Sequence, residues 1–554
     1  MARILARPPE LTSDAKRRTV SDLHVALGAD SATEGTLIPA ASDACAPAAA
    51  PHEQSVSLLR RVFTFPAMLG TVLVATVFYQ GRGFLVDPDM WWHVKVGQSI
   101  LDTRNWPTVD PYSFTVKGTP WIAYEWLGDV LLGAVARFAG LQGLDALLIV
   151  LGGVIMIALY FYGALRSGNS KAGFVASSLL CPLALLSFTL RPQMLGYLFL
   201  ILTLIVLERF RQNKPRALWF LPLLFLVWIN THGSFIIGLG AVFVYWAAGL
   251  KAFRFGEIEG RRWTPAERFR LEFVFLLCLA VLPVTPYGTR LAVYPFDMAF
   301  SQPINVANVV EWQPMPFDIP EGKLFLALVV GFFVAQMLLR PIWELAELAL
   351  FLFGAIMACL HARLLMLFVP FFAPLFATML ARWLPRYDRK KEHHALNACL
   401  MTGMAVATVW YFPTRARLQE IVSSHFPARA VDYVRGHAIP GPMYNTYGYG
   451  GYLIWALPEQ KVFIDGRGDL YERGGTLSDY SEVARLETAA FAVLRSYRIQ
   501  SCLLRRSEPL ATVLGNDPDW HKEYSDDISV LFVRRNIRAV SDAMRESATI
   551  GRKE

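Results

Sequence analysis

The feature that most constrains the fold is a series of separate apolar runs, each close to the roughly 20 residues that a helix needs to cross a bilayer. Charged residues make up only 18% of the 554 residues, below the roughly 25% of soluble domains. The sequence therefore predicts a mainly α-helical polytopic membrane protein. The expected spans, about eleven, are 62–79, 144–165, 174–188, 194–207, 218–229, 235–250, 273–284, 324–339, 342–360, 364–380 and 396–412.

The segment 121–138 decides the side of the membrane on which every later loop lies. It carries Glu125, Asp129 and Arg137 among apolar residues, and a lipid-facing span does not readily accept three charges. We therefore expect an amphipathic helix lying in the membrane interface. The basic loops 209–216, 251–270 and 382–391 then all fall on the cytoplasmic side together with the N-terminus, as the distribution of Lys and Arg in membrane proteins favours.

The net charge of +8 is accordingly explained by cytoplasmic loops, and the chain carries no nucleic-acid-binding motif. Residues 1–57 lack apolar periodicity and are expected to form a disordered cytoplasmic tail. A transmembrane domain is expected over 58–412, with an outward loop at 81–140 that includes the interfacial helix. A second tail is expected at 541–554. Between them, 413–540 is expected to form a small extracytoplasmic α/β domain, with a helix ending at 437, a helix over 480–497, and strands over 443–457, 462–465, 501–505 and 529–533.

The stretch from Asp87 to His93 follows the first span directly and combines two carboxylates, two indoles and an imidazole in seven positions. Asp87 and Asp89 have the chemistry of a proton acceptor or a metal ligand, and Trp91 and Trp92 offer faces that hold a sugar or a lipid edge. The alternative is an aromatic belt at the interface with incidental acids.

Single polar residues also stand at the mouths of the apolar segments, in turns expected on the same outward side. Ionisable groups near the membrane plane are costly to desolvate and mark a functional site. The alternative is that the arginines extend to the interface and the histidine caps a helix. A polar outward cavity explains the shared side better, and its candidates are Arg191, Gln193, His232, Glu311 and Arg363.

A Gly- and Tyr-rich turn over 445–452 precedes Asp465, Arg467 and Asp469. Glycines let a backbone approach a ligand closely, and the three charged residues are candidates for a second binding site. The alternative is an Asp–Arg pair that braces a tight turn. The glycines do not fit a dinucleotide-binding motif, which requires a preceding strand and a following helix.

Taken together, the acidic loop after the first span, the interfacial helix and the extracytoplasmic C-terminal region resemble the GT-C class of glycosyltransferases, which use polyprenyl-phosphate sugars as donors. The stretches 87–93, 191–193, 230–233, 450–455 and 463–469 are similar to those of a group of uncharacterised bacterial membrane proteins, connected to that class by architecture. The resemblance covers most of 60–540. It implies a multi-pass protein of the bacterial inner membrane.

The resemblance also implies roles for the candidate residues. Asp89 or Asp87 would stand at the position of the class's loop carboxylate, which deprotonates the acceptor or holds a metal. Arg191, His232 and Arg363, with Gln193, would bind the donor phosphate and lipid. His93 would orient the carboxylate or contact phosphate, while Glu311, Trp91 and Trp92 would position the acceptor or a metal.

The implied reaction moves a sugar from a polyprenyl phosphate to a glycan, lipid or protein acceptor, with inversion. The chain has Asp-Pro-Asp where protein mannosyltransferases have Asp-Glu, which leaves the base and a possible divalent metal open. A transporter or a scaffold for envelope polysaccharide is the non-enzymatic alternative. Transporters often show inverted repeats, which this sequence lacks. A degenerate transferase that binds glycolipid without turnover is a third possibility.

Overall fold

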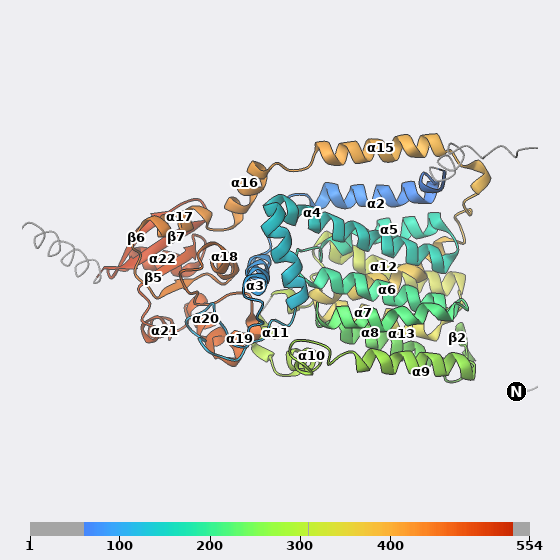
Figure 1. The fold of residues 1–554 in the computed structure, drawn as a ribbon, viewed down its shortest axis with the longest axis horizontal. Coiled ribbons are helices and arrows are strands. Elements are labelled where there is room, and N and C mark those ends of the chain that lie inside the picture. The colour runs from blue at the N-terminus through green and yellow to red at the C-terminus, as the bar shows by residue number, and fades with distance from the viewer. Residues whose placement is uncertain (1–59, 309, 536–554) are drawn as a thin grey trace, which may run out of the picture. The chain divides into compact units, whose positions relative to one another are not determined.

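The computed structural model describes residues 60–308 and 310–535. Most of this part is helical, and the long helices lie side by side in one bundle (Figure 1). The tails expected at 1–57 and 541–554 lie outside the described residues. The bundle helices are α2 (Phe65–Gly81), α4 (Trp126–Ser167), α5 (Ser170–Leu185), α6 (Gln193–Arg211), η1 (Pro215–Phe220), α7 (Leu221–Ile229), α8 (Phe235–Ala248), α9 (Pro265–Ala280), α12 (Pro320–Leu339), α13 (Leu345–Leu360), α14 (Leu365–Leu380) and α15 (His394–Trp410).

Within the described residues, four helical segments are long and apolar enough to cross a membrane: α4, α6, α12 and Ala362–Leu380. The bent pair α15 and α16 (Arg415–His425) is a fifth candidate, and α2, α5, Pro215–Ile229, α8 and α13 are shorter apolar helices. Large apolar side chains on the outside of α12, such as Leu338 at 78% exposure, suit contact with lipid. The chain is a membrane protein, and the number of about eleven spans stays a prediction.

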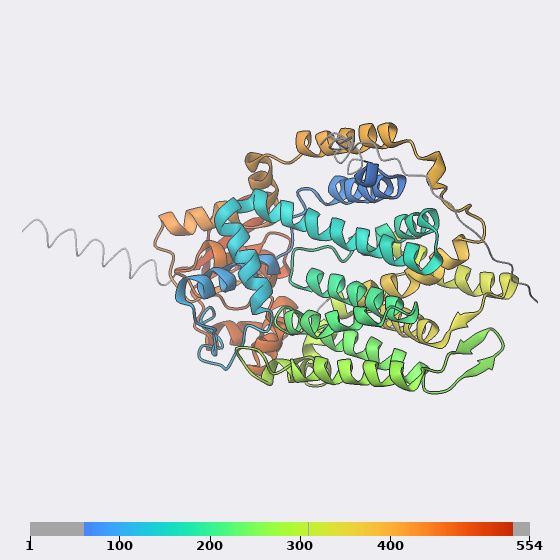
Figure 2. The ribbon, with the colours of Figure 1, turned by 45° about the vertical axis from the view of Figure 1, so that its right-hand side comes forward.

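Helix α4 contains both the segment expected as an interfacial helix and the span expected after it. It begins at Trp126, and its two arms, 126–139 and 141–167, join at Gly140, whose φ of 58° is not helical. Figures 1 and 2 show the first arm running across the end of the bundle, while the second arm runs along it. Glycine is suited to this bend because it has no Cβ to oppose a positive φ.

The first arm of α4 packs closely against α3 (Asp89–Thr103). A Cβ at Gly97 would lie 1.8 Å from the carbonyl oxygen of Asp129, and one at Gly133 would lie 2.5 Å from the amide nitrogen of Gln98. Two glycines facing the partner helix therefore permit an approach that side chains would prevent. This approach places the side chains at the start of α3 against those at the start of α4.

The other end of the bundle collects the basic loops. Arg211 contacts Glu208 and Glu344, and the Arg261 guanidinium donates to the Arg211 carbonyl. A small sheet of β1 (Phe253–Phe255), β2 (Ile258–Gly260) and β3 (Trp343–Glu344) lies at this end (Figure 1).

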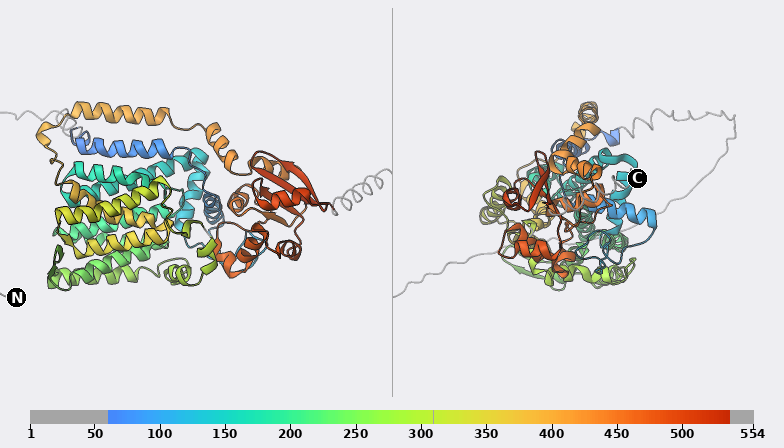
Figure 3. Two further views of the ribbon diagram at one scale, coloured as in Figure 1. Left: turned by 180° about the vertical axis from the view of Figure 1, so that it is seen from behind. Right: turned by 90° about the vertical axis from the view of Figure 1, so that its left-hand side faces the viewer.

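The C-terminal region forms a mixed four-stranded sheet in the order β4-β5-β7-β6, with β4 parallel to β5 and the other pairs antiparallel. Figure 3 shows it beyond α3, away from the bundle. The elements after α16 are α17 (Ala428–Gly436), β4 (Met443–Asn445), α18 (Tyr447–Ala456), α19 (Gly468–Arg473), α20 (Thr476–Ala484), α21 (Ala490–Ser496), β5 (Ser501–Arg505), α22 (Pro509–Asn516), β6 (Trp520–Ser525) and β7 (Ser529–Arg534).

Several expectations for this region are confirmed and others are wrong. Strands at 501–505 and 529–533 are confirmed as β5 and β7, but the strand expected over 443–457 ends at Asn445 and continues as helix α18. The segment 462–465 makes only one isolated bridge, from Val462 to Ser113, and 480–497 is divided between α20 and α21. Short apolar runs do not by themselves distinguish a buried strand from a buried helix.

Candidate active site

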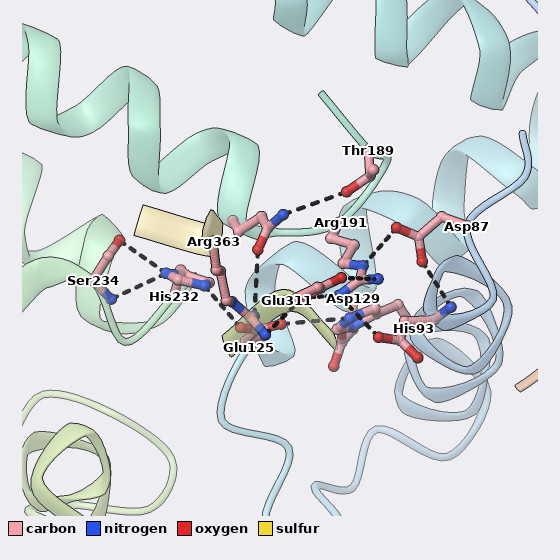
Figure 4. Close-up of polar contacts among 12 residues, drawn as sticks. Asp87, His93, Glu125, Asp129, Thr189, Arg191, His232, Ser234, Glu311 and Arg363 are labelled. Carbon is pink, nitrogen blue, oxygen red and sulfur yellow. Dashed lines mark hydrogen bonds and ion pairs between the residues drawn. The ribbon is translucent and has the colours of Figure 1, made fainter. Parts of the chain in front are cut away.

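Arg191, in the turn between α5 and α6, joins three carboxylates from two separate parts of the chain (Figure 4). Its Nε lies 2.6 Å from Asp87 Oδ2, Nη1 lies 3.0 Å from Asp89 Oδ2, and Nη2 lies 3.0 Å from Glu311 Oε1. The planar guanidinium has donors in a fixed fork, which suits several oxygens at once. The structure therefore brings these predicted turns together at one place.

The Asp-Pro-Asp sequence forms the start of α3. The Asp89 backbone N–H donates to Asp87 Oδ1 over 2.8 Å, so Asp87 holds the first turn while its other oxygen contacts Arg191. Gly466 lies against this turn, because a Cβ there would be 1.7 Å from Asp89 Oδ1. The C-terminal region thus reaches the Asp89 carboxylate by its backbone.

A second arginine, Arg363, lies next to this cluster in the short 3-10 turn Ala362–Leu364, just before α14. Its Nη1 is 3.0 Å from Glu311 Oε2, and its Nη2 donates to the Gln193 side-chain oxygen over 3.4 Å. The guanidinium also lies 5.3 Å from the centre of the Trp312 ring. Glu311 therefore bridges the two arginines.

A separate chain of imidazoles and carboxyls runs beside the arginines (Figure 4). His93 Nδ1 lies 2.6 Å from Asp129 Oδ1, and His93 Nε2 lies 3.5 Å from Glu125 Oε2. Glu125 Oε1 in turn lies 3.2 Å from His232 Nε2. The backbone N–H of Ser234 donates to His232 Nδ1 over 3.0 Å.

These groups surround a cavity of about 440 Å³ between the bundle and the C-terminal region. From the bundle side come the carboxyls, the arginines and aromatic rings. From the C-terminal side come Tyr447, Gly466, Asp469 and residues of α20. The polar and aromatic bundle-side residues are Asp89, Trp92, His93, Tyr124, Glu125, Arg191, Gln193, Asn305, Glu311, Trp312 and Arg363.

A second cavity of about 210 Å³ shares Gln193, Glu311 and Arg363 with the first. The rest of its lining is largely apolar and comes from the ends of α5, α6, α12 and α14: Leu186, Ser187, Thr189, Tyr197, Met315, Pro316, Ile319, Ala362 and Leu365. Leu186 is 47% exposed. An apolar space thus begins where the arginines end.

The structure separates the predicted site residues into two groups. Asp89, Trp92, His93, Arg191, Gln193, Glu311, Arg363 and Asp469 line the main cavity. The others lie elsewhere: Asp87 behind Arg191, His232 behind Glu125 in a smaller cavity of about 70 Å³, and Trp91 fully buried against Tyr452 and Trp455.

Asp465 and Arg467 also lie away from the cavity lining. Arg467 Nη2 is 2.7 Å from Asp465 Oδ2, and Nη1 is 2.8 Å from Asp110 Oδ1, with all three side chains fully enclosed. The guanidinium also lies 4.6 Å from the Trp121 ring centre. Their arrangement corresponds to the alternative interpretation, a charged pair that braces a turn.

Glu125 and Asp129 are two site residues that the sequence does not identify. The sequence predicts them on the polar face of an interfacial helix, but Glu125 is 8% exposed and Asp129 is 0% exposed. Their spacing of four residues places both on one helix face. That face was correctly recognised as polar, but it lies against α3 and the cavity rather than against water. Tyr124, beside them, was also missed and lines the cavity.

The cavity changes the proton affinity of the groups at its wall. Burial raises the pKa of the Asp89 carboxyl to about 6, although Arg191 opposes this, and Asp87 adds to it. Burial likewise raises the pKa of Asp469 to about 6, opposed by Arg473. Burial alone would lower the pKa of Arg191, but Asp87 and the other carboxylates raise it well above its usual value. The arginine remains charged, and Asp89 is ionised at neutral pH.

The side chains do not fit a divalent metal. Within 60–308 and 310–535, no group of three or more His, Cys, Asp or Glu side chains is placed to hold a metal ion. Asp87, Asp89 and Glu311 instead share Arg191, which already supplies the positive charge.

No protein-family model matches this chain, and no curated protein matches it. Among solved structures it is similar to the oligosaccharyltransferase of Archaeoglobus fulgidus tethered with an acceptor peptide, with 12% identity and a TM-score of 0.48 over 79% of this chain and 68% of that one. It is also similar to ArnT from Cupriavidus metallidurans. The apo state gives 15% identity and a TM-score of 0.44, over 87% of this chain and 98% of ArnT. ArnT bound to undecaprenyl phosphate gives 13% identity and a TM-score of 0.40, over 86% of this chain and 98% of ArnT. The likeness is coarse and assigns no reaction to this chain.

Proposed function

We propose that this chain is a membrane glycosyltransferase of the GT-C class, which moves a sugar from a polyprenyl-phosphate donor to an extracytoplasmic acceptor. The observation that carries the proposal is the cavity in which the Asp89 carboxylate and two guanidinium groups face the same space. A base and a phosphate site side by side are what such a transfer requires.

The donor phosphate is proposed to lie at Arg191 and Arg363, since guanidinium groups bind phosphate oxygens by paired, charge-assisted hydrogen bonds. The polyprenyl chain would continue into the adjoining apolar cavity past Leu186 and Ile319. Both cavities share Arg363 and Glu311. A lipid with a charged head and an apolar tail matches this change of lining.

The acceptor is proposed to enter on the Asp89 side, where Trp92, Tyr124 and Tyr447 offer aromatic faces to a sugar ring. Asp89 takes the proton from the acceptor hydroxyl while the oxygen of that hydroxyl bonds to the anomeric carbon of the donor sugar. The bond from that carbon to the phosphate oxygen breaks, and its electron pair leaves with the polyprenyl phosphate. Attack opposite the leaving group inverts the anomeric carbon, and the arginines stabilise the charge that develops on the phosphate.

The proposed location is the bacterial inner membrane, with residues 413–540 as an extracytoplasmic domain that covers the cavity. The basic loops around Arg211 and Arg261 lie at the end of the bundle away from the cavity. Basic loops prefer the cytoplasm, so this arrangement supports a cavity that faces outward and a cytoplasmic N-terminus.

The test is an Asp89→Asn variant of the full chain, assayed for transfer from a lipid-linked sugar. Loss of the base is expected to lower the rate by about 10²–10⁴-fold. In the wild type, the rate should fall about tenfold for each pH unit below 6, because protonation removes the base. The residual rate of the variant should lack this dependence.

Asp102→Asn is the matched control, because Asp102 lies on the same helix but is exposed and pairs with Arg137, which is also exposed. It should transfer sugar like the wild type. A rate near wild type for Asp89→Asn would remove Asp89 from the mechanism. Binding of the donor without turnover in the wild type would favour the scaffold alternative.

A further inference from the structure

The carboxyls around the main cavity have two different kinds of partner. Asp89 and Glu311 contact arginines, whereas the ion contacts of the Glu125 side chain within 60–308 and 310–535 are with the imidazoles of His93 and His232. No ion pair joins Glu125 to a lysine or arginine anywhere in the described part of the chain. A buried carboxylate without a cation is unstable and tends to take up a proton.

The hydrogen bonds of His232 fix one oxygen of Glu125 as an acceptor. Because the Ser234 backbone N–H donates to His232 Nδ1, that nitrogen carries no proton. Burial, together with the charge of Arg363, lowers the pKa of His232 to about 3, so the neutral ring carries its proton on Nε2. This N–H points to Glu125 Oε1 over 3.2 Å. A proton on Glu125 therefore sits on Oε2.

The position of His93 requires a proton on a carboxyl. Burial, followed by the charge of Arg191, lowers the pKa of His93 well below its usual value, so its ring is neutral. A neutral imidazole has one donor and one acceptor nitrogen, and the short contact of Nδ1 with Asp129, at 2.6 Å, takes the donor. The unprotonated Nε2 then faces Glu125 Oε2 at 3.5 Å, where an ionised oxygen would set two lone pairs against each other, and a proton on Oε2 avoids this.

The proton has a reason to reside on Glu125 at neutral pH. Burial raises the pKa of Glu125 to about 8 against the opposing effect of the arginines. The charged and titratable groups that face it are Arg363 and Arg191 from the turns before α14 and α6, Asp89 and His93 from α3, Asp129 from α4, His232 from the turn before α8, and Asp469 from α19.

We propose that Glu125 is a third phosphate-binding group, whose neutral carboxyl donates a hydrogen bond from Oε2 to the anion held by Arg191 and Arg363. This inference rests on the proposed function and extends its donor site. The contact from Oε2 to His93 is long, at 3.5 Å, so the O–H is free to turn toward the cavity that Glu125 lines. An ionised Glu125 would repel a phosphate and offer it no donor.

The experiment measures binding of farnesyl phosphate, a soluble polyprenyl phosphate, to the purified full chain in detergent at pH 7 and pH 9. The second ionisation of a phosphate monoester falls near pH 6, so the probe keeps its charge over this range. At pH 9 only about a tenth of Glu125 stays protonated, and wild-type affinity should fall roughly tenfold.

Glu125→Gln provides the decisive comparison, because its amide retains a donor and cannot ionise. It should bind within a few fold of the wild type at pH 7 and lose no affinity at pH 9. Asp145→Asn is the matched control: Asp145 is also buried, accepts from the Gly83 N–H and lies outside the cavity. It should show the wild-type loss of affinity.

A Glu125→Gln variant that weakens at pH 9 in parallel with the wild type would overturn the inference and leave the proposed function in place. A wild type that binds no farnesyl phosphate at either pH would overturn the donor site and the proposed function with it. If Glu125→Gln fails to fold, infrared spectra of the wild type replace it. Absorption from protonated carboxyl groups should decrease between pH 7 and pH 9, and an unchanged band would refute the loss of a Glu125 proton over this range, on which the inference depends.

Discussion

Two buried arginines, Arg467 and Arg191, show how differently this protein uses the same chemical group. The side chain of Arg467 is 0% exposed, and its two carboxylate partners are equally enclosed. Arg191 is 11% exposed and lines a cavity, and one of its partners, Glu311, is 39% exposed. The first arginine therefore has a complete and closed set of partners, while the second faces open space.

This difference separates a structural ion pair from a site. Arg467 joins the loop at Asp110 to the turn at Asp465, so it fixes two segments far apart in sequence. Glu311 is exposed enough to move away and leave donors of Arg191 and Arg363 for an anion. A closed pair resists change, and an open one permits exchange of partners. The following substitutions test that contrast.

The largest effect is expected from Arg467→Met, which leaves Asp110 and Asp465 buried without a cation. Removing one partner of a buried ion pair costs about 3–5 kcal/mol, and the measurement is the unfolding transition in detergent. Arg417→Met is the control. Its pair with Glu420 is 62% and 68% exposed, so it should change stability by only about 0–1 kcal/mol. Equal shifts in the two variants would contradict the structural role of Arg467.

Arg191→Lys should affect binding more than folding. The ammonium keeps the charge beside Asp87 but lacks the planar fork that reaches three carboxylates or a phosphate. Losing one charged hydrogen bond costs about 1.5–3 kcal/mol, so affinity for farnesyl phosphate should fall roughly 10–100-fold. Arg137→Lys, at an exposed pair with Asp102, should bind as the wild type does. Unchanged affinity in Arg191→Lys would exclude Arg191 from the phosphate site.

Gly466→Ala should give the smallest effect, at the point where the C-terminal region meets the cavity. The added methyl would overlap Asp89 Oδ1, and overpacking of this kind costs about 1–3 kcal/mol. We expect slower transfer, measured with the lipid-linked donor, because Asp89 must shift. Gly436→Ala serves as control, since a Cβ there meets no atom within 4 Å. Equal rates in the two variants would show that the C-terminal region does not position Asp89.

Much of the arginine cluster could be predicted because its residues occupy conspicuous places in the sequence. Asp87 and Asp89 follow an apolar run directly, and Arg191 and Arg363 interrupt the turns between such runs. Turns at one end of a helix bundle are necessarily near one another, so their polar residues were expected to meet. Their contacts with Glu311 agree with that expectation.

The histidine-linked carboxyls could not be predicted in the same way. The spacing of Glu125 and Asp129 shows that they share a helix face. A face that contacts water and a face that contacts a buried cavity have the same spacing of polar residues, however. The partner of that face depends on the close packing at Gly97 and Gly133, which belong to different helices. The strand expected over 443–457 is wrong for a related reason. After Asn445 the chain forms helix α18, in which Gly451 permits close packing on the start of α3, since a Cβ there would lie 2.3 Å from the Pro88 carbonyl oxygen.

The sequence alone determined that this is a membrane protein with polar residues gathered in the turns between apolar helices, because the cost of placing charge in lipid is paid locally, residue by residue. The tertiary structure decided which of those charges meet. Asp89 lies beside an arginine and Glu125 between two imidazoles, and only this pairing makes one carboxyl ionised and the other neutral in the same cavity. Proton affinity depends on surroundings that come from distant parts of the chain, so no local pattern could specify it.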